Sequence, residues 1–362
     1  MPSFYLVIAI IGVVWILLNL LYRSRREYFE KHGLKLYYGV VLVYRRKSSG
    51  EAFKSKVLSG LSYIFIPIFG YILVLFYYAM TTSFLGKIGI IEKSVEVQLL
   101  IPGINITGEQ LLYFAIAIGV AALIHEFLHA LTARLHGINV KSMGFALILV
   151  IPIAFTEIDE KEFITKPKRV RITVLSAGPV ANYVLALLAL VLLNLVVSSY
   201  GIVVVEVLPN SLAEQYGIKP EDVIVAINGE PATRSNLARV LGNNTWPGVK
   251  FVLTIMRSSG EIVNITVFKP ANITRLGIAF SDMPRMSLVK TLGLRASLMI
   301  EYLIIWLYIV NLGLAIINTA PIFISDGGRV FYELLGSRGR TIAHLINATG
   351  LALLILAVYP IG

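Results

Sequence analysis

The feature that most constrains the fold of this chain is a set of long segments with almost no charged side chains. A helix needs about 20 predominantly apolar residues to span a bilayer. Six segments have this composition: 1–22, 57–86, 110–133, 172–205, 302–325 and 341–362. Only 15% of all residues are charged, against about 25% in soluble domains. The sequence therefore excludes a soluble globular enzyme and predicts a polytopic α-helical membrane protein with about six transmembrane helices.

The first apolar segment is predicted to be a helix that the mature protein keeps. Arg23, Arg25 and Arg26 follow it, where the small residues of a signal-peptide cleavage site would otherwise stand. Residues 1–56 are accordingly predicted to form an N-terminal transmembrane helix and a basic segment. No role is predicted for the basic segment beyond its charge.

The distribution of basic residues predicts the orientation of the helices. The segments 23–56, 134–171 and 327–343 hold ten, seven and three Lys or Arg residues, whereas 85–109 holds two. Because Lys and Arg concentrate in cytoplasmic loops, the first three segments are expected inside, and both termini and residues 201–290 outside. The net charge of +11 then belongs to the loops. No nucleic-acid partner is expected, since no stacking aromatics or nucleic-acid-binding module accompany the charge.

Residues 201–282 differ in character from the rest of the chain, because charges return and short apolar runs alternate with turn signals. Strands are predicted at Val203–Val207, Val223–Ile227, Phe251–Met256 and Ile262–Phe268, and short helices at about 211–217 and 235–241. Asn228-Gly229 is a strong hairpin signal. The sequence predicts an inserted α+β domain here, between the two parts of a membrane core at 57–200 and 283–362.

The residues that indicate chemistry are His125, Glu126 and His129, which form the pattern His-Glu-x-x-His in the third apolar segment. On a helix, two histidines four residues apart lie on one face and can share a metal ion, and the glutamate can act on a metal-bound water. Each ionisable residue costs on the order of 3 kcal/mol at the bilayer centre. A bound dication would compensate this cost, although polar residues along an ion path would give a similar pattern.

A catalytic zinc site usually has three protein ligands, so a further ligand is expected elsewhere in the chain. Asp326 is the strongest candidate, because it ends the fifth apolar segment between Pro321, which interrupts a helix, and Gly327. Asp326 could alternatively cap a helix at the membrane interface. The remaining histidines are expected in loops or near helix ends, and they are His32, His136 and His344.

Taken together, these motifs resemble the site-2 protease family of intramembrane zinc metalloproteases. The resemblance rests on the His125–His129 motif, on the Asn-x-x-Pro-x-x-x-x-Asp-Gly run from Asn318 to Gly327, and on the domain between them, which looks like a PDZ domain. Residues 144–155 resemble the membrane-embedded β-hairpin of the family, and Ala177–Asn182 resembles the start of its next helix. The similarity covers most of residues 110–330.

The resemblance implies a role for each matching residue of the motifs. His125, His129 and Asp326 would bind one Zn²⁺ per chain. Glu126 would be the general base that takes a proton from the zinc-bound water and gives it to the leaving amine. Asn318 matches a position thought to hold the substrate or the tetrahedral oxyanion.

Asn182 also matches the family, but its role stays open between a function at the site and packing beside a Gly-Pro break.

The resemblance also implies a substrate, whereas the location is predicted from the basic loops, from the depth of His125 along its apolar segment and from the compactness of the chain. The substrate would be a transmembrane segment of another membrane protein, already trimmed by a different protease, and cleavage would serve regulated intramembrane proteolysis. The substrate would unwind and could add as a strand to the hairpin at 144–155. The PDZ-like domain, outside the membrane, could exclude untrimmed substrates or bind the new carboxyl terminus. The zinc site is expected toward the cytoplasmic face of a prokaryotic or archaeal plasma membrane, in contact with lipid.

The main alternative is a membrane transporter or scaffold with a PDZ-like binding module and no proteolytic activity. That alternative predicts no bound zinc. A different zinc protease with a glutamate as third ligand is disfavoured, because Glu301 stands at the outer end of the fifth apolar segment, away from the histidine pair.

Overall fold

The computed structural model describes residues 2–47, 55–149, 151–243 and 245–359. The chain divides into two compact units. The first unit, called the membrane unit here, combines Met1–Ala189 with Trp306–Gly362, and the second, called the α+β unit, is Leu190–Ile305. Each unit has a core of its own.

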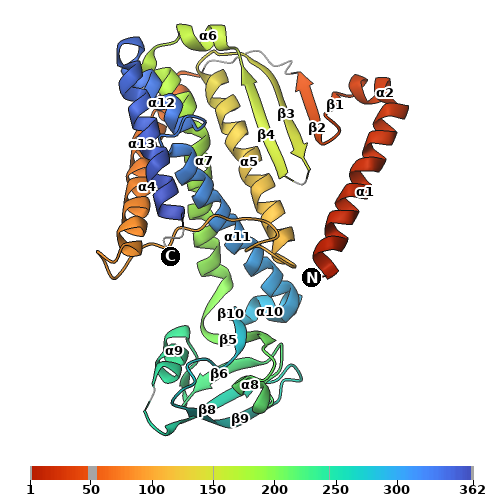
Figure 1. Ribbon diagram of the computed structural model, residues 1–362, viewed down its shortest axis with the longest axis vertical. Coiled ribbons are helices and arrows are strands. Elements are labelled where there is room, and N and C mark those ends of the chain that lie inside the picture. Colours follow the sequence, from red (N-terminus) through yellow and green to blue (C-terminus); the bar gives the residue numbers. More distant parts are fainter. Residues whose placement is uncertain (1, 48–54, 150, 244, 360–362) are drawn as a thin grey trace. The chain divides into compact units, whose positions relative to one another are not determined.

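Five helical segments among the described residues are long and apolar enough to cross a membrane. The helices that form them are α3 (Lys56–Ser62) with α4 (Phe65–Lys87), α5 (Gln110–Leu135), α7 (Lys168–Val196), α11 (Leu294–Thr319), and η1 (Ser337–Gly339) with α13 (Arg340–Val358) (Figure 1). They correspond to the second to sixth predicted segments and fit a polytopic membrane protein. Helix α1 (Pro2–Ser24) covers the first segment, but its described apolar part, Ile11–Ser24, is shorter. The predicted count of six spans therefore stays a prediction.

Two of the apolar segments are not helical throughout. Helix α7 ends at Val196, and strand β5 (Val197–Val207) follows directly, because the β-branched run in this strand favours extended backbone. Helix α11 ends at Thr319, and α12 (Asp326–Leu335) begins only after a non-helical stretch. Pro321 lies in that stretch and accounts for the break, as predicted from its missing N–H.

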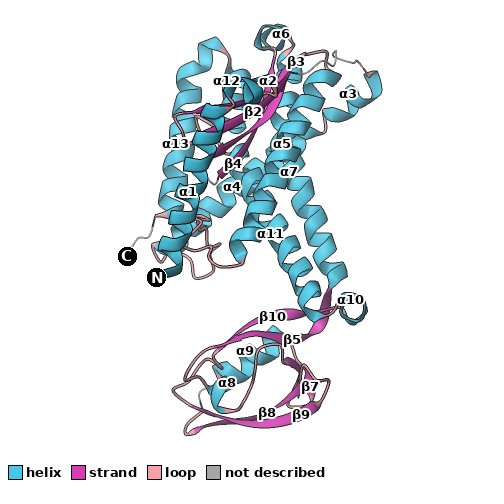
Figure 2. Cartoon of the chain, turned by 90° about the vertical axis from the view of Figure 1, so that its right-hand side faces the viewer, coloured by secondary structure: helices cyan, strands magenta, loops and turns pink. Residues whose placement is uncertain are grey.

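A four-stranded antiparallel sheet belongs to the membrane unit. Its order is β1-β2-β3-β4, and the strands are β1 (Leu34–Tyr37), β2 (Val41–Lys47), β3 (Val140–Ile148) and β4 (Ile151–Ile158) (Figure 2). The hairpin predicted at 144–155 is the β3–β4 pair, in which Gly144 lies opposite Phe155. Strands β1 and β2 come from the basic segment 23–56, for which no structure was predicted. They follow the short helix α2 (Arg26–Lys31) and extend the hairpin from its β3 side.

Helix α5 lies beside β4, and the short helix α6 (Glu160–Thr165) leads from β4 into α7 (Figure 1). The Thr156 hydroxyl donates to the Glu126 carbonyl oxygen at 2.9 Å and ties the last strand of the sheet to the helix. The sheet therefore extends from the helix that carries the predicted His-Glu-x-x-His motif.

The α+β unit holds the predicted inserted domain. Its sheet has the order β10-β5-β6-β8-β9, with β7 paired to β6. Besides β5, its elements are α8 (Leu212–Gln215), β6 (Val223–Ile227), β7 (Glu230–Pro231), α9 (Arg234–Gly242), β8 (Gly248–Met256), β9 (Ile262–Pro270), β10 (Ile278–Pro284) and α10 (Met286–Leu292). Each predicted strand and helix of this region is present, and the turn at Asn228-Gly229 joins β6 to β7. Strand β10, which pairs with β5, was not predicted.

Candidate metal centre

Two histidines on one face of α5 form the centre of the site. His125 and His129 are four residues apart, so the helical repeat stacks them one turn from each other. Their Nε2 atoms lie 3.1 Å apart. His125 is buried, and His129 is nearly so. The predicted pairing of the two histidines on one helix face is therefore present in the structure.

A carboxylate from the opposite end of the sequence joins them. Asp326 is the first residue of α12, just after the non-helical stretch that follows α11. Ser325 is the N-cap of α12: its Oγ accepts from the Gly328 N–H at 3.0 Å and donates toward the carbonyl oxygens of Ala320 and Ile322, at 2.6 and 2.9 Å. Ser325 thus satisfies several of the backbone polar groups that the break between α11 and α12 leaves without helical partners.

The start of α12 lies close to the end of α11, and this close approach depends on Gly327. A methyl group at this position would overlap the carbonyl oxygens of Thr319 and Ala320. The glycine next to Asp326 is therefore required by the space available.

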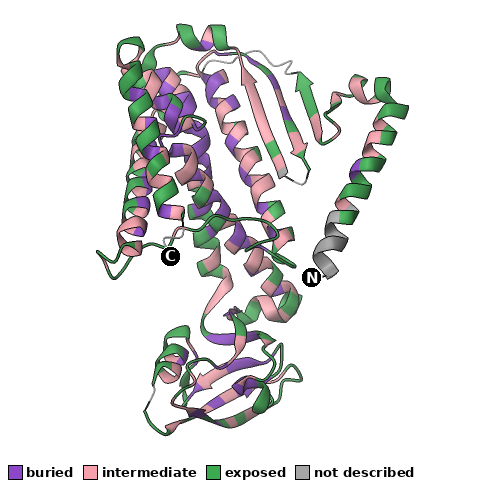
Figure 3. Ribbon diagram, in the orientation of Figure 1, coloured by how far each residue is buried: buried purple, intermediate pink, exposed green. Residues whose placement is uncertain are grey.

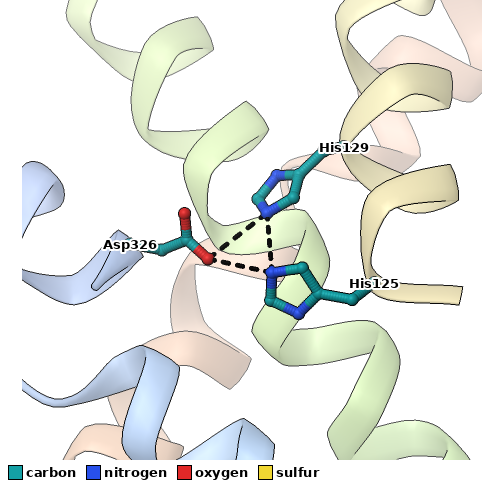
Figure 4. Close-up of side chains that lie close together, drawn as sticks. All are labelled: His125, His129 and Asp326. Atoms are coloured by element: carbon teal, nitrogen blue, oxygen red, sulfur yellow. Dashed lines mark hydrogen bonds and ion pairs between the residues drawn. The ribbon is translucent and has the colours of Figure 1, made fainter. Parts of the chain in front are cut away.

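The three side chains converge on one point. Asp326 Oδ2 lies 3.1 Å from His125 Nε2 and 3.3 Å from His129 Nε2, and Figure 4 shows all three atoms facing one another. Ligands of a tetrahedral zinc ion, bound at about 2.0–2.1 Å, are separated by about 3.3 Å. The triangle of 3.1, 3.1 and 3.3 Å is therefore the size of one face of such a tetrahedron. Two imidazoles and a carboxylate are also a donor set that zinc accepts.

Each histidine is oriented by a hydrogen bond from its other ring nitrogen. Nδ1 of His125 lies 2.8 Å from Asn182 Oδ1, and Nδ1 of His129 lies 2.7 Å from the Val174 carbonyl oxygen. Both partners are acceptors, so each Nδ1 carries the proton and each Nε2 keeps its lone pair for a metal. Such partners are a regular feature of metal-binding histidines.

A buried asparagine pair extends this support to a third helix. Asn182 of α7 and Asn311 of α11 are both fully buried, and Asn182 Nδ2 donates to Asn311 Oδ1 at 3.0 Å. Asn311 Nδ2 donates in turn to the Leu307 carbonyl oxygen at 2.8 Å. Asn182, whose role the sequence leaves open, thus contacts His125 in the structure. Asn311 was not predicted, although an asparagine inside an apolar segment is itself a signal of a buried polar contact.

Gly178 brings the backbone of α7 up to the cluster. A methyl group at this position would overlap Nε2 of both His125 and His129. The space beside the two nitrogens is therefore open only because residue 178 has no side chain.

The structure separates the other histidines from this centre. Nε2 of His136 lies 2.9 Å from Ser62 Oγ, His32 Nδ1 lies 2.8 Å from the Tyr28 carbonyl oxygen, and His344 Nδ1 lies 2.9 Å from the Tyr332 hydroxyl. Burial and the nearby Lys166 lower the pKa of His136.

The two residues expected to act on the substrate lie on α5 and α11. Glu126 follows His125 on α5 and is half-buried, and Asn318 lies on the last turn of α11 and is also half-buried. Glu301, the alternative carboxylate, is buried in the α+β unit, where its Oε1 accepts from the Ser281 hydroxyl at 3.0 Å.

Comparison with protein families matches residues 113–357 to Peptidase family M50. An uncharacterized protein of Methanocaldococcus jannaschii is 27% identical over 92% of this chain and 86% of its own length. A putative zinc metalloprotease of Clostridium acetobutylicum is 24% identical over 68% of this chain and 97% of its own length. The regulator of sigma-E protease RseP of Salmonella typhimurium is 30% identical over 32% of each chain.

The family match covers more than half of the chain and includes both α5 and α12, the helices that carry the three converging side chains. Relatives named zinc metalloproteases imply Zn²⁺ as the metal, in agreement with the donor set and its spacing. The chain is therefore a metalloprotease and belongs to Peptidase family M50, the site-2 protease family.

Proposed function

We propose that this chain is an intramembrane zinc metalloendopeptidase that cleaves transmembrane segments of membrane proteins. The observation that carries the proposal is the convergence of His125, His129 and Asp326 within 3.3 Å of one another. The two histidines lie on α5, which is long and apolar enough to span a membrane, and Asp326 follows the end of α11, which is another such helix. In the proposal these residues are the zinc ligands, and Glu126 and Asn318 act on the substrate.

When bound, Zn²⁺ supplies Lewis acidity, which activates water for attack and polarises a peptide carbonyl. Glu126 accepts the proton of the attacking water and delivers it to the leaving amine. The side-chain amide of Asn318 donates a hydrogen bond to the oxyanion as it develops. Asn182 and the Val174 carbonyl hold both imidazoles in the tautomer that leaves Nε2 free.

The substrate must become extended before it is cut, because a helical peptide bond is shielded by its own hydrogen bonds. Strand β4 is the last strand of its sheet and pairs with β3 on one side. We assign the other edge of β4 to the substrate, which would add as a further strand. Since β4 contacts α5, a strand added there would pass close to the helix that carries Glu126.

The α+β unit acts in this proposal as a PDZ-like domain outside the membrane. It excludes substrates that another protease has not yet trimmed, or binds the carboxyl terminus that the first cut creates. Its elements follow the order expected of that domain from the sequence. The enzyme would then work in regulated intramembrane proteolysis in a prokaryotic or archaeal plasma membrane, with the metal site toward the cytoplasm.

The first experiment is elemental analysis of zinc in detergent-purified protein prepared without chelators. The wild type should hold about one zinc per chain, and Asp326→Ala should hold less than about a tenth of that. Asp282→Ala, which removes a carboxylate from the α+β unit, is the matched control and should keep its zinc. Zinc retained by Asp326→Ala would remove Asp326 from the ligand set. A zinc-free wild type would favour the transporter or scaffold instead.

The second experiment separates the general base from the metal. Glu126→Gln should retain zinc and lose proteolysis of a transmembrane substrate by roughly 10³-fold, whereas Glu109→Gln, at the start of the same helix, should cleave normally. Cleavage by Glu126→Gln at the wild-type rate would contradict the assigned role, whatever its zinc content.

The third experiment tests the filter. Val197 and Pro284 are partners at the ends of β5 and β10, so a short Gly-Ser linker can replace residues 197–284. The shortened protein should cleave untrimmed substrate that the wild type leaves intact. If it cleaves trimmed substrate but still leaves untrimmed substrate intact, the α+β unit is not the filter.

A further inference from the structure

A basic pocket of about 850 Å³ lies between the end of α2 and the four-stranded sheet. Five cationic side chains line it: Lys31 from α2, Lys35 from β1, and Arg45, Arg46 and Lys47 from β2. Figure 1 shows α2 standing beside β1 and β2, away from the helices that carry the metal centre. We call this cavity the basic pocket.

The register of the sheet explains why the charges gather. Side chains alternate between the two faces of a strand, so Arg45 and Lys47 share a face with Val43. Lys35 lies directly opposite Val43 on the neighbouring strand. Lys35, Arg45 and Lys47 therefore stand on one face of the sheet, whereas Arg46 lines the pocket from a position whose side chain alternates to the other face.

The positive charge of the pocket is largely uncompensated. Among the residues that the structure describes, Glu30 is the one acidic residue that lines it, and its carboxylate already accepts from Arg26 at 2.9 Å and from the Tyr22 hydroxyl at 3.1 Å. Arg45 pairs with Glu157 at 3.3 Å.

The remaining four cations, Lys31, Lys35, Arg46 and Lys47, make no ion pair with any residue in the described parts of the chain. Like charges held this closely repel one another, so an anion in the pocket would be favoured.

The pocket also lies at the end of an apolar helix. Helix α1 ends at Ser24, two residues before α2 begins. Much of its described length is exposed (Figure 3), and its exposed apolar residues include Val13, Ile16, Leu17 and Leu20. Trp15 Nε1 donates to the Leu149 carbonyl oxygen at 3.0 Å and Asn19 Nδ2 to the Gly39 carbonyl oxygen at 2.7 Å. These bonds hold α1 to the turns of the sheet that forms the pocket.

We propose that the basic pocket binds the phosphate-bearing headgroup of an anionic phospholipid, with the acyl chains of the lipid lying along α1. A lipid fits the arrangement because one molecule carries both an anion for the pocket and an apolar part for the adjacent helix. The predicted orientation places the pocket at the cytoplasmic leaflet, which is the anionic one. The inference is independent of proteolysis, since the pocket shares no residue with the metal centre.

The test measures lipid binding to the full-length protein in a neutral detergent by native mass spectrometry. The probes are dioctanoyl phosphatidylglycerol, dioctanoyl phosphatidylcholine, inorganic phosphate and a hexaglutamate peptide. The pocket variant is Lys31→Gln/Lys35→Gln/Lys47→Gln. The matched control, Lys161→Gln/Lys166→Gln/Arg338→Gln, removes the same charge from basic loops outside the pocket. All six side chains are exposed or half-buried, so both variants should fold, as circular dichroism can verify.

We expect one phosphatidylglycerol to bind the wild type and the control with similar affinity, and to bind the pocket variant about 100-fold more weakly. Phosphatidylcholine and free phosphate should bind far more weakly than phosphatidylglycerol. A Lys35→Arg/Lys47→Arg variant should bind like the wild type, because it keeps the charge.

Several outcomes would overturn the proposal. Equal phosphatidylglycerol binding by the pocket and control variants would place the lipid elsewhere. Phosphatidylcholine binding as tight as phosphatidylglycerol binding would exclude recognition of negative charge. Binding of free phosphate as tight as the lipid would make the site one for a soluble anion. Hexaglutamate binding that depends on the pocket, without phosphatidylglycerol binding, would assign it to an acidic protein segment.

Discussion

The residues buried along α5 and α7, near the metal centre, differ from those in the core of the α+β unit. In the membrane unit, the buried residues of α5 and α7 are mostly small or polar, and they include Ala117, Ala121, His125, Ser176, Ala177, Gly178, Ala181 and Asn182. In the α+β unit, the buried residues are large and apolar, and they include Ile202, Ile224, Phe251, Leu253, Ile255 and Val267.

The difference agrees with the predicted surroundings of each unit, lipid for the membrane unit and water for the α+β unit. Lipid tails are as apolar as leucine, so helices in a bilayer gain little by burying leucine and associate instead through close contacts of small residues and hydrogen bonds. In water, burial of apolar area is the main driving force. A change of size or hydrogen bonding inside the membrane unit should therefore act on the metal centre. A change inside the α+β unit should act on stability and leave the metal centre intact.

The largest expected effect is that of Gly178→Ala. The added methyl group would overlap Nε2 of both histidines, so zinc binding should fall by at least about 100-fold, as chelator competition can measure. Gly119→Ala on α5 is the matched control, because open space surrounds that position, and it should bind zinc normally. Normal zinc affinity in Gly178→Ala would show that the site tolerates a change of size.

Phe251→Ala should lower the stability of the α+β unit and leave zinc binding unchanged. Phe251 is buried in the core of the α+β unit, and a Phe→Ala change in a core costs about 3–5 kcal/mol. Urea unfolding followed through the exposed Trp246 should show the loss, while zinc content stays at the wild-type level. Ile262→Ala, at a site that is 66% exposed, should cost much less. Zinc lost together with stability in Phe251→Ala would remove the distinction between the two interiors.

Asn311→Leu should weaken zinc binding about tenfold. The substitution removes the shorter of the two hydrogen bonds that Asn182 Nδ2 donates, to Asn311 Oδ1 at 3.0 Å, and leaves the one to the Ala121 carbonyl oxygen at 3.3 Å. Asn182 orients His125, and Asn311 touches none of the proposed ligands. Asn194→Leu serves as the control, since Asn194 Nδ2 donates only within α7, to the Leu190 carbonyl oxygen. Equal zinc affinity in the two variants would mean that the hydrogen-bonded chain ends at Asn182.

The smallest effect concerns acid stability at the edge of the membrane unit. Asp159 caps α6, and the backbone N–H of Glu162 and the Lys141 ammonium lower the pKa of its carboxyl. Because this pKa is lower in the folded protein, the stabilisation is present above the unfolded pKa, about 3.9, and is lost as the pH falls through the folded value. As the pH falls from about 5 to about 3, the melting temperature of the wild type should therefore fall slightly more than that of Asp159→Asn. Parallel pH profiles would contradict this.

Much of this organisation is visible in the sequence, because it depends on local patterns. Apolar length predicts the helices, and turn residues such as Asn228-Gly229 predict the strands of the α+β unit. Helical repeat places His125 beside His129. Asp326 could be proposed from the helix break before it, and the structure brings all three within 3.3 Å.

Other features depend on contacts between distant segments and could not be predicted in this way. Strands β1 and β2 pair with a hairpin about 100 residues later in the chain, and nothing local in the basic segment indicates that partner. Strand β10 was missed for the same reason, since its partner β5 lies at the other end of the α+β unit. Asn311 has a role only because α7 and α11 pack together.

The separation of the three proposed ligands along the chain has a consequence for synthesis. Asp326 follows His129 by 197 residues and His125 by 201. At about 5–20 residues per second, a ribosome makes the aspartate ~10–40 s after the histidines. During that interval the nascent protein holds two of the three residues of the proposed metal site, so we expect no peptidase activity while α7 and α11 are being made.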